Sequence, residues 1–139
     1  QIPPWLGPKT LVCAFQNGLG NYETLLKSVP AERLALGRVI FGVELEPGHV
    51  RVTVFADEVL IGSPDARFPS TQAAALAAAL QESGIPARAT ATILTALWAK
   101  VLYNCALNGL SALFEVPYGK LPVSSDDFED LRAMGLIEG

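Results

Sequence analysis

The sequence has few side chains that could bind a metal ion or form a disulfide bond. It contains one histidine, His49, and two cysteines, Cys13 and Cys105, which lie far apart and outside any C-x-x-C motif. A structural zinc site needs about four Cys, His or carboxylate ligands brought together, so the sequence predicts no metal site. Each cysteine lies in an apolar run, and we expect both to be buried, reduced thiols of a cytoplasmic protein.

The sequence also lacks an excess of positive charge. It has 10 Lys and Arg against 14 Asp and Glu, a net charge of -4 and a pI near 4.9. Nucleic-acid binding needs a basic surface that attracts phosphate groups. A nucleic-acid partner is therefore not expected.

Charged residues are scarcest between Thr90 and Phe114, where Lys100 is the only one. A helix of this length could cross a bilayer. However, a lysine near its centre costs ~2.5 to 3.5 kcal/mol on insertion scales, and Asn104 and Asn108 add to that cost. The segment therefore predicts a buried helix of a soluble protein, with no membrane partner.

The order of the predicted elements indicates an α/β part followed by an all-α part. Apolar runs bounded by turn residues predict strands at 10–15, 38–45, 50–55 and 58–62. Helical patterns predict helices at 21–27, 71–83 and 90–114, and a short one at 126–134. Gly84 is expected to end the second of these helices, because glycine readily adopts the left-handed conformation after a helix.

Three polar residues recur at four-residue intervals in the long apolar helix: Lys100, Asn104 and Asn108. On a helix they fall within about an 80° arc, together with Ser111. One interpretation is structural, with the lysine paired to a carboxylate and the asparagines bonded to backbone. The other is a stripe that faces a substrate, because lysine supplies a charge and a proton while asparagine supplies a donor and an acceptor.

A second candidate site is the loop Gln16-Asn17-Gly18-Leu19-Gly20-Asn21, which follows the first predicted strand. In open α/β sheets ligands bind beyond the carboxyl ends of strands, so Asn17 is a candidate ligand contact. Alone, an Asn-Gly pair is equally typical of a turn with no other role. Asn21 is predicted to cap the following helix.

Together the two motifs resemble the ketopantoate reductase (2-dehydropantoate 2-reductase) family. The resemblance rests on QNGLGN and on W-x-K-x-x-x-N-C-A-x-N-x-L-x-A-L, with about eighty residues between them. The turn Leu45-Glu46-Pro47-Gly48 and the tail Pro117-Tyr118-Gly119-Lys120-Leu121 extend it over nearly the whole chain.

The resemblance implies an oxidoreductase with two domains. Residues 1–86 would be the C-terminal part of a Rossmann-type NADPH-binding domain, and residues 87–139 the first part of a helical substrate and dimerisation domain. The reaction implied is NADPH-dependent reduction of 2-dehydropantoate to pantoate in pantothenate and coenzyme A biosynthesis, in the cytoplasm. A homodimer is a further implication.

The resemblance also implies roles for four residues. Lys100 takes the position of the catalytic lysine that protonates the substrate carbonyl oxygen. Asn104 and Asn108 match the two substrate-binding asparagines. Asn17 matches the asparagine that contacts both the nicotinamide of the cofactor and the substrate.

Departures from the family pattern leave alternatives open. Tyr118 stands where some members have a substrate-contacting asparagine, and Gly109 replaces a frequent proline. The alternatives are a paralogous reductase of another 2-oxo acid and a non-catalytic helical association module. Because the family's glycine-rich phosphate loop would lie before Gln1, these 139 residues alone are expected to be inactive.

Overall fold

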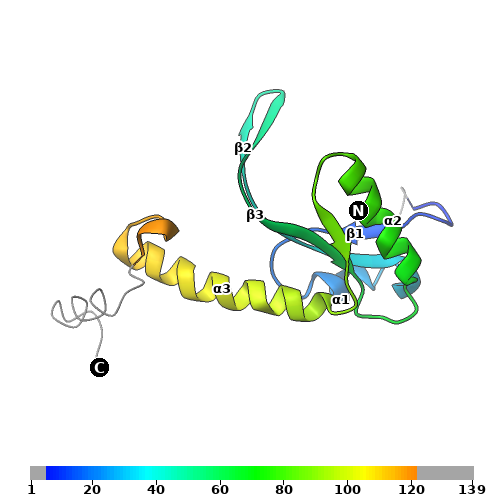
Figure 1. Cartoon of the computed structure of the whole chain (residues 1–139). Helices are drawn as coiled ribbons and strands as arrows, with labels where there is room; N and C mark the ends of the chain where they lie inside the picture. The colour runs from blue at the N-terminus through cyan, green and yellow to red at the C-terminus, as the bar shows by residue number, and fades with distance from the viewer. Residues whose placement is uncertain (1–5, 122–139) are drawn as a thin grey trace. The chain divides into compact units, whose positions relative to one another are not determined.

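The computed structural model describes residues 6–121, which contain a four-stranded sheet and three α-helices (Figure 1). The strands, in spatial order, are β1 (Val12–Ala14), β2 (Leu34–Glu46), β3 (His49–Gly62) and β4 (Ala87–Ala89). β1 is parallel to β2, β2 is antiparallel to β3, and β3 is parallel to β4. The helices are α1 (Asn21–Leu25), α2 (Ser70–Glu82) and α3 (Ile93–Phe114).

The predicted fold class, α/β followed by helix, is confirmed. The chain divides into two compact units, residues 1–99 and residues 100–139. The domain division expected from the sequence, 1–86 and 87–139, stays a prediction. The helix predicted at 126–134 lies outside the described residues.

The strand prediction was wrong in three respects: segments 50–55 and 58–62 form one continuous strand, β2 begins four residues earlier than predicted, and β4 was not predicted. β3 passes through Asp57, which pairs with Ile40 where the register of β2 and β3 shifts. Arg38 of β2 donates a hydrogen bond to the Asp57 carboxylate at 2.8 Å. The irregular pairing and this ion pair accommodate the charged residue without ending the strand.

The core of the first unit lies on both faces of the sheet. On the face covered by α2, Ala35, Val59 and Ile61 pack with Phe68 and with alanines of the helix. On the other face, Ala14, Leu36 and Leu60 pack with Ile93 and Leu97 from the start of α3. Alternate residues of a strand face opposite sides, so Leu60 and Ile61 contribute to different clusters.

Two helix ends test the capping predictions. α2 ends as predicted: Gly84 has φ of 83°, its N–H bonds to Gln81 O, and the Ile85 N–H bonds to Leu80 O. This is the Schellman pattern. The N-cap of α1 is Gly20, not Asn21 as predicted. Asn21 is already helical, and its Nδ2 donates to the backbone oxygens of Asn17 and Gly18.

The hairpin of β2 and β3 extends beyond the part of the sheet that β1 and β4 flank (Figure 1). Near its tip, Glu44 and Arg51 form an ion pair across the strands. Aliphatic side chains there are exposed, among them Val43, Val52 and Leu45, the last with 81% of its surface accessible. This arm therefore adds little to the core.

The prediction of a buried α3 was wrong for most of the helix. Of its residues, only Ile93 and Leu97 are buried, whereas Trp98, Leu102 and Leu113 are each more than half exposed. The apolar composition of the segment was read correctly, but burial requires a packing partner. Within the first unit, the sheet provides one for Ile93 and Leu97.

Candidate functional site

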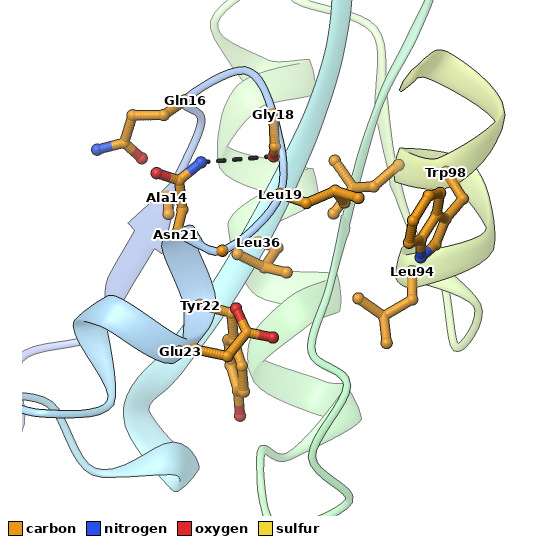
Figure 2. A pocket seen from close by; sticks show the side chains of 12 residues that line it. Ala14, Gln16, Gly18, Leu19, Asn21, Tyr22, Glu23, Leu36, Leu94 and Trp98 are labelled. Atoms are coloured by element: carbon orange, nitrogen blue, oxygen red, sulfur yellow. Dashed lines mark hydrogen bonds between the residues drawn. The ribbon is translucent and has the colours of Figure 1, made fainter. Parts of the chain in front are cut away.

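The first unit contains a cavity of about 150 Å³ at the carboxyl end of β1. One wall is made of the loop after β1, apart from Asn17, and the first turn of α1, and the other is made of Leu36, Leu94, Leu97 and Trp98. Figure 2 shows the loop residues on one side and Leu94 and Trp98 of α3 on the other. Pockets for drug-sized ligands measure about 300 to 1,000 Å³, so this cavity suits a single ring or a small acid.

Backbone geometry shapes the loop wall of the cavity. Gly18 and Gly20 have φ of 87° and 86°, in the left-handed region that favours glycine. The side chain of Asn21 bonds back to Gly18 O, which holds the loop closed (Figure 2). The two glycines, Leu19 and Tyr22 therefore line one side of the cavity, opposite the leucines and Trp98 of the other side.

Arg38 places a positive charge on the same face of the sheet as Leu36 and Leu60, since it lies two residues after Leu36 and pairs with Leu60. Its side chain is only 6% exposed, while that of Asp57, its ion-pair partner, is 52% exposed. The hydrogen bond from Arg38 lowers the pKa of the Asp57 carboxyl below its usual value of 3.8, and the N–H of Glu58 adds to the effect. Arg38 Nε is buried and has no hydrogen-bond partner in residues 6–121.

The polar stripe of α3 lies in the second unit from Lys100 onward. Lys100 and Asn104 are half-buried, and Asn108 is exposed. On the helical wheel these three residues follow Ile93 and Leu97 along one face, within about 80°. The face that is apolar at the start of α3 therefore becomes polar from Lys100 onward.

The end of α3 turns the chain back toward Asn108. Glu115 has φ of 53°, and the Val116 N–H bonds to Ser111 O at 3.2 Å. The Ser111 hydroxyl donates to Val116 O. Ser111, which shares the arc of the polar stripe, therefore helps to close the helix end.

The short 3₁₀ helix Tyr118–Lys120 follows this turn and brings Tyr118 to the stripe. The Tyr118 hydroxyl donates a hydrogen bond to Asn108 Oδ1. The ring of Tyr118 also meets that of Tyr103 edge to face, with 6.5 Å between the ring centroids. Tyr118 thus contacts both Asn108 and Tyr103.

The predicted site residues fall into two groups. Lys100, Asn104 and Asn108 lie on one face of α3 in the second unit, as the spacing predicts. Asn17 lies in the first unit, in the exposed loop after β1, but does not line the cavity. Their predicted roles stay predictions.

Sequence reasoning missed several residues that line the cavity. Leu94, Leu97 and Leu36 carried no signal beyond apolarity, and Tyr22 and Glu23 were read as part of a short helix. Trp98 did carry a signal, because it lies two residues before Lys100 at the head of the second motif. Its place in the cavity depends on how the start of α3 meets the sheet.

The cysteines differ more than the sequence predicts. Cys13 lies in β1, and burial raises the pKa of its thiol to about 12. Cys105 is exposed, so the expectation that it is buried was wrong. Both thiols are free.

No three His, Cys, Asp or Glu residues within 6–121 are arranged to hold a metal ion. Among the helices that the structure describes, none combines the length and apolarity that crossing a membrane requires.

The sequence and the fold of this chain are both similar to those of known proteins. Residues 1–66 match the family model described as Ketopantoate reductase PanE/ApbA. The 2-dehydropantoate 2-reductase of Aquifex aeolicus is 42% identical over 122 residues, which are 87% of this chain and 39% of that protein. The chain thus spans about two fifths of the length of this relative.

The solved structures that this chain resembles include an enzyme with the same name as the sequence relative above. The crystal structure of 2-dehydropantoate 2-reductase from Geobacter metallireducens matches with a TM-score of 0.78 and 29% identity, over 97% of this chain and 44% of that one. A complex of D-mandelate dehydrogenase with NADH also matches with a TM-score of 0.78, at 26% identity, over 99% of this chain and 49% of that one. The resemblance to the family of reductases that the two motifs indicated is confirmed.

Proposed function

Because residues 1–66 match the ketopantoate reductase family model and 122 residues are 42% identical to a 2-dehydropantoate 2-reductase, we propose that the protein reduces the carbonyl group of a 2-oxo acid with a nicotinamide dinucleotide. 2-Dehydropantoate is the proposed substrate, since the relatives are named 2-dehydropantoate 2-reductase. NADPH is the proposed cofactor, because the resemblance of the two motifs implies it. The observation that carries the proposal is the face of α3 on which Lys100, Asn104 and Asn108 follow one another in an otherwise apolar helix.

The proposed roles follow from the charge that develops in the reaction. When a carbonyl carbon is reduced, its oxygen becomes an alkoxide that must gain a proton. Lys100 is proposed to donate this proton as a general acid and to stabilise the negative charge before the transfer. Asn104 and Asn108 are proposed to bind the carboxylate and hydroxyl oxygens of the substrate, and so to orient its carbonyl.

The loop after β1 offers features that fit the nicotinamide end of the cofactor. When bound, NADPH supplies the hydride. The cavity has the size for one ring, with Trp98 and Leu97 as an apolar wall and Gln16 among the residues of the opposite wall. Asn17, one residue further along this loop, is proposed to contact both the cofactor's carboxamide and the substrate.

Two alternatives have observations in their favour. The first is a paralogous reductase of another 2-oxo acid, because the fold also matches a D-mandelate dehydrogenase bound to NADH. The second is a non-catalytic helical association module, because Trp98, Leu102 and Leu113 of α3 are exposed. A homodimer that covers these residues would also be compatible with the enzyme.

A steady-state assay separates these possibilities. The complete gene product is assayed against 2-dehydropantoate, pyruvate, 2-oxoisovalerate and phenylglyoxylate, each with NADPH and with NADH. Highest kcat/KM for 2-dehydropantoate with NADPH supports the proposal, and a preference for another acid or for NADH supports the paralogue. No turnover with any pair, together with a stable oligomer in light scattering, supports the association module.

A further inference from the structure

We propose that Tyr118 is a positioning residue that fixes Asn108 as a hydrogen-bond donor toward an anionic oxygen of the substrate. The inference rests on the proposed function, and it assigns a chemistry to one position of that site. Its basis is the hydrogen bond from the Tyr118 hydroxyl to Asn108 Oδ1.

The amide of an asparagine presents two different ends to a ligand. Oδ1 accepts hydrogen bonds and Nδ2 donates two, and rotation by 180° about the last bond exchanges them. An exposed asparagine samples both arrangements. At Asn108 the phenol engages Oδ1, which leaves the hydrogens of Nδ2 for another acceptor, such as an oxygen of the substrate.

Tyr118 is itself held in place from two sides. The edge-to-face contact with Tyr103 restrains its ring. The backbone before it is fixed by the bond from Val116 N–H to Ser111 O and by Glu115 in the left-handed conformation. A non-glycine residue with positive φ costs free energy, so the surrounding contacts must stabilise this turn.

The consequence is a charge preference at this end of the stripe. While the phenol engages Oδ1, Asn108 presents the hydrogens of Nδ2, which bind carboxylate or alkoxide oxygens well and hydroxyl hydrogens poorly. With Asn108 turned in this way, the position selects the carboxylate of a 2-oxo acid over a neutral ketone or an ester. Tyr118 acts through Asn108 and needs no contact with the reacting atoms.

Tyr118→Phe tests the inference, because it removes the hydroxyl and keeps the ring against Tyr103. In the complete gene product, KM for the preferred 2-oxo acid is expected to rise about 3- to 10-fold, the usual value of one hydrogen bond, with kcat within about twofold. Tyr103→Phe is the matched control, since it removes a hydroxyl from the neighbouring ring, and it should change neither constant. If Tyr118→Phe and the wild type have equal KM, the inference is overturned. Turnover by the wild type supports the proposed function independently of that result.

A double-mutant cycle shows whether Tyr118 acts through Asn108. In the Asn108→Ala background, Tyr118→Phe should have no further effect on KM, because no amide remains to be oriented. The same 3- to 10-fold rise in that background would show that Tyr118 acts alone, and would overturn the inference. A wild type that reduces none of the acids overturns the proposed function and, with it, the substrate role of the pair.

A readout without turnover completes the test. In protein labelled with ¹⁵N at asparagine, the side-chain NH₂ signals of Asn108 are identified from their loss in Asn108→Ala. They should shift in Tyr118→Phe and stay in place in Tyr103→Phe, because only the first change removes the bond to Oδ1. Unchanged signals in Tyr118→Phe would show that the amide is not held by the phenol and would overturn the inference.

Discussion

The two compact units of the chain differ in what their apolar residues do. In residues 6–99, leucine, isoleucine, valine and alanine are buried on both faces of the sheet. From Lys100 to Leu121 the sequence is as apolar, yet Leu121 is the only buried apolar residue in this stretch. Local composition predicts helix or strand, but burial depends on what packs against the element. We infer that stability resides in the first unit and that the candidate chemistry resides on α3 of the second.

The largest expected effect that separates the units is on catalysis. Lys100→Ala in the complete gene product should lower kcat by about 10²- to 10⁴-fold, because a positioned general acid contributes about that much. Cofactor affinity, measured by fluorescence titration, should change little. Lys27→Ala is the control, since Lys27 is exposed in the first unit. Turnover of Lys100→Ala equal to wild type would contradict the proton-donor role and favour the structural interpretation of the stripe.

The next largest effect is expected on the free energy of unfolding, when a buried residue of the sheet is truncated. Ile61 is 1% exposed and contacts the α2 face of the core. Ile61→Ala should lower the free energy of unfolding by about 2 to 5 kcal/mol, through lost burial and a cavity. Leu45→Ala, at the exposed tip of the arm, should change it by less than about 0.5 kcal/mol. Urea unfolding of both variants measures the difference, and equal losses would mean that the arm is packed as the sheet is.

Asn108→Ala tests whether the second unit's stripe is functional or structural. If Asn108 binds substrate, kcat/KM should fall by an equivalent of about 2 to 4 kcal/mol, since a charged partner loses its hydrogen bond. The melting temperature should stay within a few degrees, because the exposed side chain adds little stability. The opposite result, a large loss of melting temperature with unchanged kcat/KM, would assign Asn108 to structure.

The reactivity of the two thiols can be compared within the chain without any ligand. A pKa of about 12 leaves Cys13 almost without thiolate at neutral pH, about 10³-fold less than a thiol with the usual 9.0. Cys105 is exposed and should react with iodoacetamide first. Mass spectrometry of the native protein over time, with the Cys105→Ser variant as control, measures the order. Faster modification of Cys13 would contradict its burial in β1.

Much of the first unit follows from the sequence, because its signals are local. Apolar and β-branched runs predicted β1 and most of β2 and β3, and Gly84 predicted the end of α2, whereas β4 was not predicted. The charge of Asp57 predicted a break between two strands. The strand continues because Arg38, nineteen residues away in the sequence, forms an ion pair with Asp57. The N-cap at Gly20 was missed because the asparagine side chain bonds backward instead of forward.

The candidate site was predictable only in part. The four-residue spacing of Lys100, Asn104 and Asn108 places them on one helix face wherever that helix lies. The contact of Asn108 with Tyr118 was not predictable, since it requires the turn at Glu115 and a 3₁₀ helix after it. The Trp98 wall of the cavity likewise depends on tertiary packing.

The smallest effect is expected at Asp57, where the packed sheet gives way to the arm. The hydrogen bond from Arg38 lowers the pKa of the Asp57 carboxyl below 3.8 in the folded protein. The stability that this pair contributes is therefore present above the unfolded pKa, and is lost as pH falls through the folded pKa. Because the carboxylate is half exposed, solvent screens the pair and the contribution is small.

Asp57→Asn should accordingly lower the melting temperature slightly at neutral pH, and the difference from wild type should disappear as the solution is acidified below the folded pKa. Calorimetry of both proteins across this range measures the difference, and carbon NMR of the Asp57 carboxyl measures its titration directly. A difference that grows on acidification would reverse the sign derived from the ion pair. A carboxyl that titrates at or above 3.8 would show that Arg38 does not hold it, and would leave the buried guanidinium as a charge that the sheet stabilises by other means.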